Sequence, residues 1–184
     1  MIDDPNKLVQ FVRSILEHEL LGKEISYTFF FENYNEPSGV FVTLYKNDKL
    51  RGCIGYPLPF LPLWKAIINA SKGAAFNDQR FSPVTKEELK DISIEVTVLS
   101  KPEVIDVKKP ETILEHIKIG ETGLLIEKGP FSGLLLPQVA KEYNWDKITY
   151  LEQLCFKAGL DNDSWKDKQT TISKFTGIVI KEKK

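Results

Sequence analysis

The stretch Leu50-Arg51-Gly52-Cys53-Ile54-Gly55 is the most informative part of this sequence. It combines the alternation typical of a strand with a thiol and two glycines. If these residues form a strand, Arg51 and Cys53 lie on one face, while Leu50 and Ile54 lie on the other. The apolar face then anchors the strand in a core. The second face presents a cation and a sulfur, and the glycines allow a ligand or another chain to approach the backbone closely.

The segments around this stretch predict a hairpin followed by a helix. Residues 40–45 alternate like a strand and Asn47-Asp48 supplies a turn, so the stretch is the return arm of the hairpin. Prolines between 57 and 62 end that strand, and a helix follows from residue 64. Its C-terminal end is slim, which lets another element come close, and it leads into the loop 77–83, a second candidate site. The residues that make this end slim are Ala70, Gly73, Ala74 and Ala75.

The rest of the chain predicts further helices and strands. The expected helices are one capped by Asn6 that ends near Gly22, a short run at 111–116, one that begins at Pro137, and one that carries Ile148, Leu151 and a buried Cys155. The expected strands are 92–99, 117–120, 123–127, 133–136 and 170–180, and the aromatic run 29–31 predicts a short strand or a hydrophobic plug. We expect a single domain over 1–184, with tentative lobes 1–101 and 111–184, a linker at 102–110 and a possible strand exchange between the lobes.

Composition excludes several classes of protein. The 184 residues are 42% hydrophobic, which is enough for a globular core, and a net charge of -1 disfavours a broad nucleic-acid footprint. The N-terminal residues show no signal-peptide pattern and no apolar run reaches membrane-spanning length, so we expect a cytoplasmic protein without a membrane partner. Cys53 and Cys155 cannot build a disulfide framework, and neither His18 nor His116 stands at ligand spacing from a cysteine. The sequence therefore predicts no metal and no cofactor, and it leaves the oligomeric state open.

Arginine is rare in this chain. Of the 25 Lys and Arg residues, only Arg13, Arg51 and Arg80 are arginine. A guanidinium differs from an ammonium in its rigid fork, its bidentate pairing with carboxylate or phosphate and its tolerance of burial. Arg51 and Arg80 are therefore either structural anchors paired with acidic residues such as Asp78 or Glu95, or contacts to a ligand, and the sequence leaves both alternatives open.

Five motifs occur in order over most of the chain. They are 50–55, the Asp78-Gln79-Arg80-Phe81 run followed by Pro83, and the segments 95–100, 133–139 and 155–160. In this order they resemble the AMMECR domain family, named for a human chromosomal region linked to Alport syndrome, intellectual disability, midface hypoplasia and elliptocytosis. The resemblance implies an α+β protein of two unequal subdomains, with mixed or antiparallel sheets flanked by helices and the 50–55 motif near the cleft between them. The family has no settled biochemical activity, so the resemblance predicts a fold and not a reaction.

Two positions depart from the family pattern. Gln79 stands where members commonly have proline, which frees one backbone N–H and leaves Asp78 and Arg80 in place. Thr122 stands where many members have a histidine. A Cys–His pair involving that position is therefore not predicted for this chain.

The candidate function is the binding of a small anionic or peptide-like ligand around the 50–55 motif. An anionic small molecule, a peptide carboxylate or a nucleotide would be held by guanidinium groups and by backbone N–H groups beside the glycines. The candidate binding residues are Arg51, Gly52, Gly55, Asp78, Arg80, Glu95 and Gln138.

Two alternatives remain open. Cys53 can be the nucleophile or redox thiol of an enzyme, with Glu95 or Gln138 orienting a substrate, although no base is evident and a buried, inert thiol is the favoured explanation of the residue. The chain can also be a protein-interaction adaptor, if its tryptophans or the aromatic run 29–31 are exposed anchors.

Overall fold

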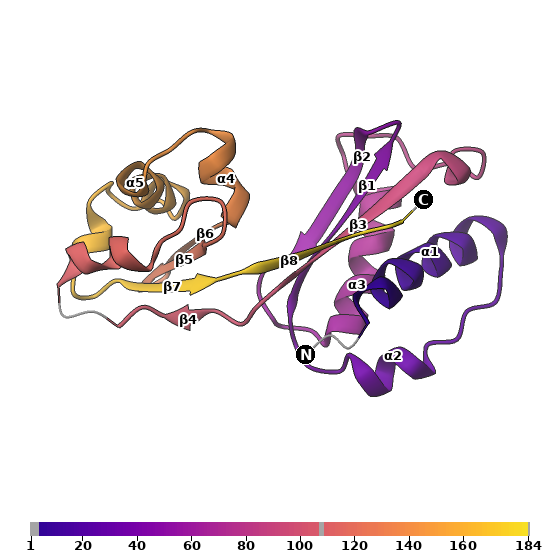
Figure 1. Cartoon of the computed structure of the whole chain (residues 1–184), viewed down its shortest axis with the longest axis horizontal. Helices are drawn as coiled ribbons and strands as arrows, with labels where there is room; N and C mark the ends of the chain where they lie inside the picture. The colour runs from indigo at the N-terminus through magenta and orange to yellow at the C-terminus, as the bar shows by residue number, and fades with distance from the viewer. Residues whose placement is uncertain (1–3, 107–108, 184) are drawn as a thin grey trace. The chain divides into compact units, whose positions relative to one another are not determined.

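The computed structural model describes residues 4–106 and 109–183 and shows an α+β protein with two four-stranded sheets (Figure 1). The chain divides into two compact units. Unit 1 comprises Met1–Leu99 and Ile178–Lys184, and unit 2 comprises Ser100–Gly177. No helix in the described part of the chain is both long and apolar enough to cross a membrane. The predicted linker 102–110 includes residues 107–108, which lie outside the described residues, so the linker stays a prediction.

Unit 1 is built on a sheet with the strand order β2-β1-β3-β8. Its helices are α1 (Pro5–Leu21), α2 (Thr28–Asn33) and α3 (Leu63–Lys72), and its strands are β1 (Gly39–Lys46), β2 (Lys49–Tyr56), β3 (Ile92–Leu99) and β8 (Gly177–Lys181). Both β2 and β3 pair antiparallel with β1. A π-helix, Gly73–Asn77, extends α3, and a 3-10 helix, Leu89–Asp91, precedes β3.

The hairpin predicted around the 50–55 motif is confirmed. Asn47 and Asp48 turn the chain with φ angles of 50° and 60°, the left-handed region that two-residue hairpin turns require. The pairing register shifts between Leu44 and Tyr45, so that Gly52 lies opposite Leu44, Leu50 lies opposite Tyr45, and Arg51 is the extra residue of a β-bulge. The bulge changes the alternation, and the predicted core position of Leu50 is wrong because this side chain is 41% exposed.

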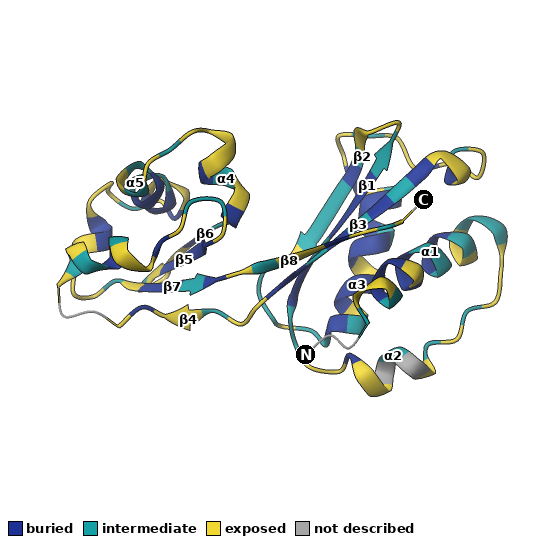
Figure 2. Cartoon of the chain, viewed as in Figure 1, coloured by how far each residue is buried: buried dark blue, intermediate teal, exposed yellow. Residues whose placement is uncertain are grey.

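Helices α1 and α3 cover one face of this sheet, where α3 packs against β1 and β2 and α1 packs against β3 and α3. Figure 2 shows the buried residues along β1 and on the helix sides that meet it. The apolar positions predicted for α1 are buried, and the helix ends at Gly22 with φ 70°, as expected. Its N-cap is Asp4 rather than the predicted Asn6, because Pro5 suits the first helical position and the Asp4 carboxylate accepts the Asn6 N–H.

The aromatic run at 29–31 does not form the short strand that its β propensity favours. It lies in α2, whose backbone bonds run from Phe30 N–H to Tyr27 and from Tyr34 N–H to Phe30. The Phe30 ring stacks on Phe11 of α1 with a centroid distance of 3.7 Å. The alternative of a hydrophobic plug therefore describes Phe30, since a helix turn places it and Tyr34 on the same side, toward the core.

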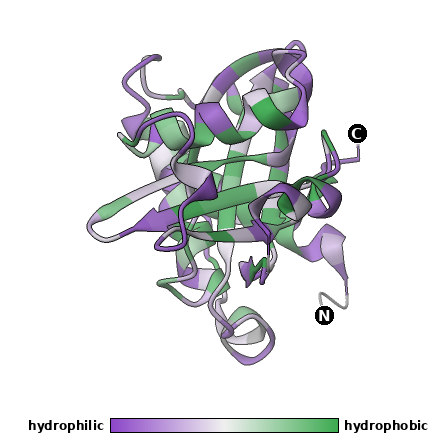
Figure 3. Cartoon of the chain, turned by 90° about the vertical axis from the view of Figure 1, so that its left-hand side faces the viewer, coloured by the Kyte–Doolittle hydropathy of each residue, from purple (hydrophilic) through white to green (hydrophobic). Residues whose placement is uncertain are grey.

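Unit 2 contains the sheet β4-β7-β5-β6, in which the neighbouring strands are antiparallel. Its elements are β4 (Glu103–Val104), β5 (Gly123–Lys128), β6 (Phe131–Leu135), α4 (Pro137–Glu142), α5 (Lys147–Lys157), β7 (Thr171–Phe175), and the 3-10 helices Pro110–His116 and Ser164–Lys166. Helix α5 packs against β5 and β6 over a second core. Figure 3 shows that the hydrophobic residues concentrate in the strands, whereas many loop residues are hydrophilic. Pro137 begins α4 and Cys155 is fully buried, as predicted.

Two predicted strands in the second half need correction. Residues 117–120 form no strand, because the backbone N–H groups of Glu121 and Thr122 both bond to the Lys118 carbonyl in a turn that includes Gly120 at φ 85°. The strand was predicted because Ile117 and Ile119 alternate with polar residues, a pattern that is also typical of a strand. The predicted strand 170–180 is two strands, β7 and β8, separated at residue 176 and belonging to different sheets.

Candidate functional site

The outer face of the unit 1 sheet carries a row of polar side chains on neighbouring strands. Cys53 of β2 lies opposite Thr43 of β1, which in turn lies opposite Glu95 of β3. The Thr43 hydroxyl donates to the Cys53 Sγ at 3.3 Å, and the Glu95 carboxylate pairs with Lys181 of β8 at 3.3 Å. This face therefore joins a half-buried thiol, a buried hydroxyl and an ion pair across four strands.

The free edge of β2 at Cys53 is closed by two side chains from the loop after the π-helix. The Cys53 N–H donates to Asp78 Oδ2 at 2.9 Å, and Arg80 Nη2 donates to the Cys53 carbonyl at 3.2 Å. A neighbouring strand would satisfy the same two backbone groups. Asp78 and Arg80 thus replace strand pairing at this position, which protects the edge from pairing with another chain.

The two edge residues hold each other in a bidentate ion pair. Arg80 Nε donates to Asp78 Oδ1 at 2.9 Å and Arg80 Nη2 donates to Asp78 Oδ2 at 2.7 Å. These bonds, with the two backbone N–H groups that it accepts, hold the pKa of the buried Asp78 carboxyl well below its usual range, although burial alone opposes the shift. The same carboxylate raises the pKa of Arg80, and the neighbouring Cys53 side chain adds to that effect.

The space beside the Cα atoms of the motif's glycines is occupied by other parts of the same chain. A Cβ at Gly52 would lie 2.0 Å from the Ala74 carbonyl oxygen in the π-helix, and one at Gly55 would lie 2.3 Å from the Phe41 ring. The slim helix end predicted from the sequence is confirmed, since Gly73 also lies against Ile54. The close approach that the glycines permit therefore positions the π-helix on β2. That packing in turn places Asp78, the residue directly after the π-helix, at the strand edge.

Arg51, the bulged residue, faces a carboxylate that the sequence did not single out. Its Nε and Nη2 donate to the two oxygens of Glu88 at 3.2 and 2.9 Å, and Nη2 also reaches the Pro83 carbonyl. Lys46 donates to the same carboxylate at 2.8 Å. Together these partners lower the pKa of Glu88 to about 2, the Arg51 bond first among them. Arg51 Nη1 is buried without a hydrogen-bond partner among the described residues.

All three arginines make the same type of contact. Each guanidinium binds one carboxylate through two nitrogens and donates to a backbone carbonyl, and Arg13 does so with Glu182 and with Leu89 and Ile92. The three differ in exposure, because the side chains of Arg13, Arg51 and Arg80 are 22%, 14% and 56% exposed. Arg80 is therefore the arginine that is both fixed in place and accessible to a ligand.

A pocket of about 640 Å³ opens on the same unit, next to Glu95. Its lining residues are Tyr45, Asp48, Ser93, Ile94, Glu95, Lys181 and Glu182. Carboxylates outnumber the single lysine here, and both Glu95 and Glu182 already have cationic partners. This pocket therefore offers hydroxyl and carboxylate groups beside the polar row and no additional site for an anion.

The other predicted residues lie elsewhere. Gln138 is exposed on α4 in unit 2, whereas the remaining candidates all belong to unit 1. His18 binds the Lys23 carbonyl in unit 1, and His116 belongs to unit 2. Within residues 4–106 and 109–183, no group of three or more His, Cys, Asp and Glu side chains is arranged to hold a metal ion.

The tryptophans are not freely exposed. Trp165 is buried, and Trp64 and Trp145 are half-buried. The large hydrophobic side chains that are more exposed include Phe60 and Phe156, at 81% and 72%.

Sequence reasoning missed Thr43 and Glu88. Counting back from Asn47-Asp48 in an unbroken register pairs Thr43 with Gly52, and only the β-bulge at Arg51 brings Thr43 opposite Cys53. Glu88 had no signal in the sequence either, because it lies in a largely charged run, 86–91, that is typical of a solvated surface.

The family model for AMMECR1 matches residues 9–180 of this chain. The chain belongs to the AMMECR1 family. It is 46% identical over 176 residues to protein MJ0810 of Methanocaldococcus jannaschii, covering 95% of this chain and 88% of that protein. It is 47% identical to a protein of Aquifex aeolicus, covering 98% of this chain and 93% of the relative.

A solved structure supports the same assignment. The crystal structure of the uncharacterized protein PH0010 from Pyrococcus horikoshii is similar with a TM-score of 0.79 at 42% identity, over 97% of this chain and 91% of that chain. The membership and the α+β fold that the motifs predicted are thus confirmed for this AMMECR1-family protein. The relatives' names state no activity, so the function must be argued from the site.

Proposed function

We propose that this AMMECR1-family protein is a cytoplasmic binding protein for a small anionic or peptide-like ligand, and that Arg80 holds the ligand's carboxylate beside Cys53. The observation that carries the proposal is that Arg80 is fixed by Asp78 and the Cys53 carbonyl while 56% of its side chain stays exposed. A guanidinium that is already ordered loses little conformational entropy when it binds an anion.

Arg80 keeps one nitrogen available. Its Nε and Nη2 are used by Asp78 and Cys53, whereas Nη1 has no hydrogen-bond partner among the described residues. A carboxylate oxygen can accept from Nη1, with the Cys53 thiol next to it. Arg51 also has an Nη1 without a partner, but that nitrogen is buried and the side chain beside Glu88 is only 14% exposed, so a ligand cannot reach it. The structure thus supports Arg80, rather than Arg51, as the ligand contact.

The test is a titration followed by amide chemical shifts in nuclear magnetic resonance spectra of the whole chain. The ligands are trialanine with a free carboxylate, the same peptide as its C-terminal amide, and acetate. We expect the free peptide to shift the Cys53 and Arg80 amide signals saturably, and the amidated peptide to bind more weakly by about tenfold or more. Acetate reports the carboxylate contact alone.

Three variants locate the contact. Arg80→Lys keeps the charge and loses the fork, so it should weaken binding, whereas Arg51→Lys should leave it unchanged. Lys86→Gln removes an exposed cation from the same loop and serves as the matched control. Binding that is equally strong in Arg80→Lys, or equal affinity for the free and amidated peptides, would contradict the proposal.

A reactive Cys53 is the second candidate, favoured by the 3.3 Å contact from the Thr43 hydroxyl and by the neighbouring guanidinium of Arg80. Iodoacetamide labelling of the native protein near neutral pH tests it, with the fully buried Cys155 as the internal comparison. Faster labelling of Cys53 in the wild type than in Arg80→Lys supports an activated thiol. A Cys53 that resists labelling excludes a nucleophilic role.

A further inference from the structure

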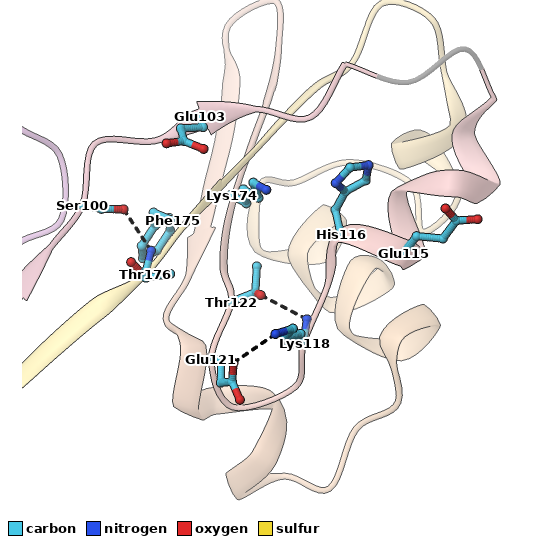
Figure 4. Close-up of a pocket in the computed structure, with 10 residues that line it drawn as sticks. All are labelled: Ser100, Glu103, Glu115, His116, Lys118, Glu121, Thr122, Lys174, Phe175 and Thr176. Carbon is cyan, nitrogen blue, oxygen red and sulfur yellow. Dashed lines mark hydrogen bonds and ion pairs between the residues drawn. The ribbon is translucent and has the colours of Figure 1, made fainter.

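Unit 2 contains a separate pocket of about 470 Å³ that none of the motifs above explains (Figure 4). It is lined by Ser100, Glu103, Glu115, His116, Lys118, Glu121, Thr122, Lys174, Phe175 and Thr176. These residues come from β4, β7, the end of the 3-10 helix Pro110–His116 and the turn before β5, and from Ser100 and Thr176, which lie just outside the strands. The volume lies in the range of small-molecule sites, and every lining residue belongs to the same unit.

Lys174 is the unusual residue of this pocket. It alternates with the buried Ile172 along β7 and lies opposite the buried Leu124 of β5, so its side chain projects from the core face of the sheet. The residue is half-buried, yet its ammonium makes no ion pair or hydrogen bond within the described chain. The Lys174 ammonium is therefore able to pair with an anionic group of a ligand.

The charges of the lining show what kind of partner Lys174 lacks. Lys118 and Glu121 face each other at 3.9 Å and cancel. Glu115 points away from Lys174 in Figure 4, whereas Glu103 lies directly across from Lys174 in the register of β4 and β7. Besides that pair the lining holds one cation and two carboxylates, and Lys174 and Glu103 are the opposite charges that lie on adjacent strands, which matches a ligand with one negative and one positive group better than a multiply charged anion.

Neutral polar groups lie beside these charges. The Thr122 residue is buried, and its Oγ1 accepts the Lys118 N–H at 3.0 Å, which leaves the hydroxyl hydrogen free to donate. His116 faces the same space as Lys174 (Figure 4). A carboxylate placed near Lys174 would thus find two further polar side chains within the pocket.

We infer that this pocket binds a small zwitterion of the amino-acid type, with its carboxylate at Lys174 and Thr122 and its ammonium at Glu103. In this placement each charged group of the ligand lies beside a protein side chain of the opposite charge. This site is independent of the one proposed around Cys53, so either can fail without the other.

The experiment uses three molecules of nearly equal size. Alanine carries both charges, propionate carries the carboxylate alone, and ethylamine carries the ammonium alone. Each is titrated into the full chain while the backbone amide signals of Lys118, Thr122 and Lys174 are followed. We expect saturable shifts with alanine and affinities at least about tenfold lower for propionate and ethylamine.

Single substitutions assign the contacts. Lys174→Gln and Glu103→Gln should each weaken alanine binding by about tenfold, because each removes one charge partner. Lys157→Gln and Glu127→Gln change exposed charges elsewhere on unit 2 and should have no effect. Glu103 is itself exposed, so its substitution tests the site even if the Lys174 variant is unstable.

Three outcomes would overturn the inference. Alanine that gives no saturable shift would show that the pocket does not bind an amino-acid zwitterion. If alanine binds both variants as tightly as the wild type, then neither Lys174 nor Glu103 contacts the ligand. Propionate that binds as tightly as alanine, with Glu103→Gln unaffected, would leave a carboxylate site and exclude the zwitterion.

Discussion

Replacing Asp78 with asparagine should destabilise unit 1 and expose the edge of β2 at Cys53. Asp78 accepts four N–H groups, one from Cys53 and three from Arg80, at 2.7 to 3.1 Å. The asparagine NH₂ must face two of these donors, since it replaces one of the two oxygens. Each oxygen accepts one backbone N–H and one guanidinium N–H, so in either orientation the N–H of Cys53 or that of Arg80 loses its acceptor. The exposed guanidinium regains water, and we expect a loss of about 2 kcal/mol in the free energy of unfolding.

The destabilisation should depend on pH, with a sign fixed by the lowered pKa of Asp78. In the unfolded chain the pKa of Asp78 is near its ordinary value of 3.8. In the folded chain the pKa is lower, so the carboxylate stays ionised to a lower pH. The stability that this carboxylate contributes is therefore complete above the ordinary pKa and is lost as the pH falls toward the folded value. The difference between the wild type and Asp78→Asn should be largest near neutral pH and shrink on acidification below 3.8.

Urea unfolding at several pH values measures this difference, and hydrogen exchange of the Cys53 amide reports the edge locally. We expect the amide of Cys53 or that of Arg80 to lose protection in the variant while β1 and β3 keep theirs. A stability difference that is the same near pH 7 as near pH 3 would refute the electrostatic argument. Amides of Cys53 and Arg80 that both stay fully protected would refute the assignment of Asp78 as their acceptor.

Three further substitutions test the packing and the charges. Gly52→Ala places a methyl group 2.0 Å from a backbone oxygen of the π-helix, so it should cost about 1–3 kcal/mol in urea unfolding and shift the Asp78 amide signal. Glu88→Gln leaves the buried Arg51 guanidinium without its carboxylate and should lower the melting temperature at neutral pH, an effect that should fade as the pH falls from the ordinary pKa of 4.5 to about 2, where the wild-type carboxylate becomes protonated in the folded chain. Tyr150→Phe removes a fully buried hydroxyl within reach of three backbone carbonyls and should cost about 1–2 kcal/mol in urea unfolding. No loss of stability in Tyr150→Phe would show that those carbonyls are satisfied without it.

The elements that the sequence predicted correctly are those whose signals are local. The turn at Asn47-Asp48, the α1 end at Gly22 and the Pro137 start of α4 each depend on backbone conformations that those residues favour. The run 29–31 was ambiguous because its aromatic residues suit a strand, and the packing of Phe30 against Phe11 of α1 and the core favours the helix. Tertiary packing decided that element, and no pattern within the run records it.

The site was predicted less completely, for a reason that the β-bulge illustrates. Strict alternation placed Leu50 in the core, but one extra residue at Arg51 reverses the side to which Leu50 points. The partner of Arg51 could not be named either, because Glu88 lies 37 residues away in an irregular segment. Asp78 was singled out from its motif, whereas its bond to the edge of β2 depends on the packing of the π-helix at Gly52.

The scarcity of arginine acquires a physical explanation in unit 1. All three guanidinium groups contact the segment 78–92, which is largely irregular and has few backbone partners of its own. A lysine could neutralise the same carboxylates but could not bind two oxygens and a carbonyl in one plane. The guanidinium groups of Arg13 and Arg51 are largely enclosed, and their contacts with the segment 78–92 explain them as structural anchors. Arg80 is anchored in the same way and still exposes its outer nitrogen, so structural use and ligand binding are not alternatives at this residue.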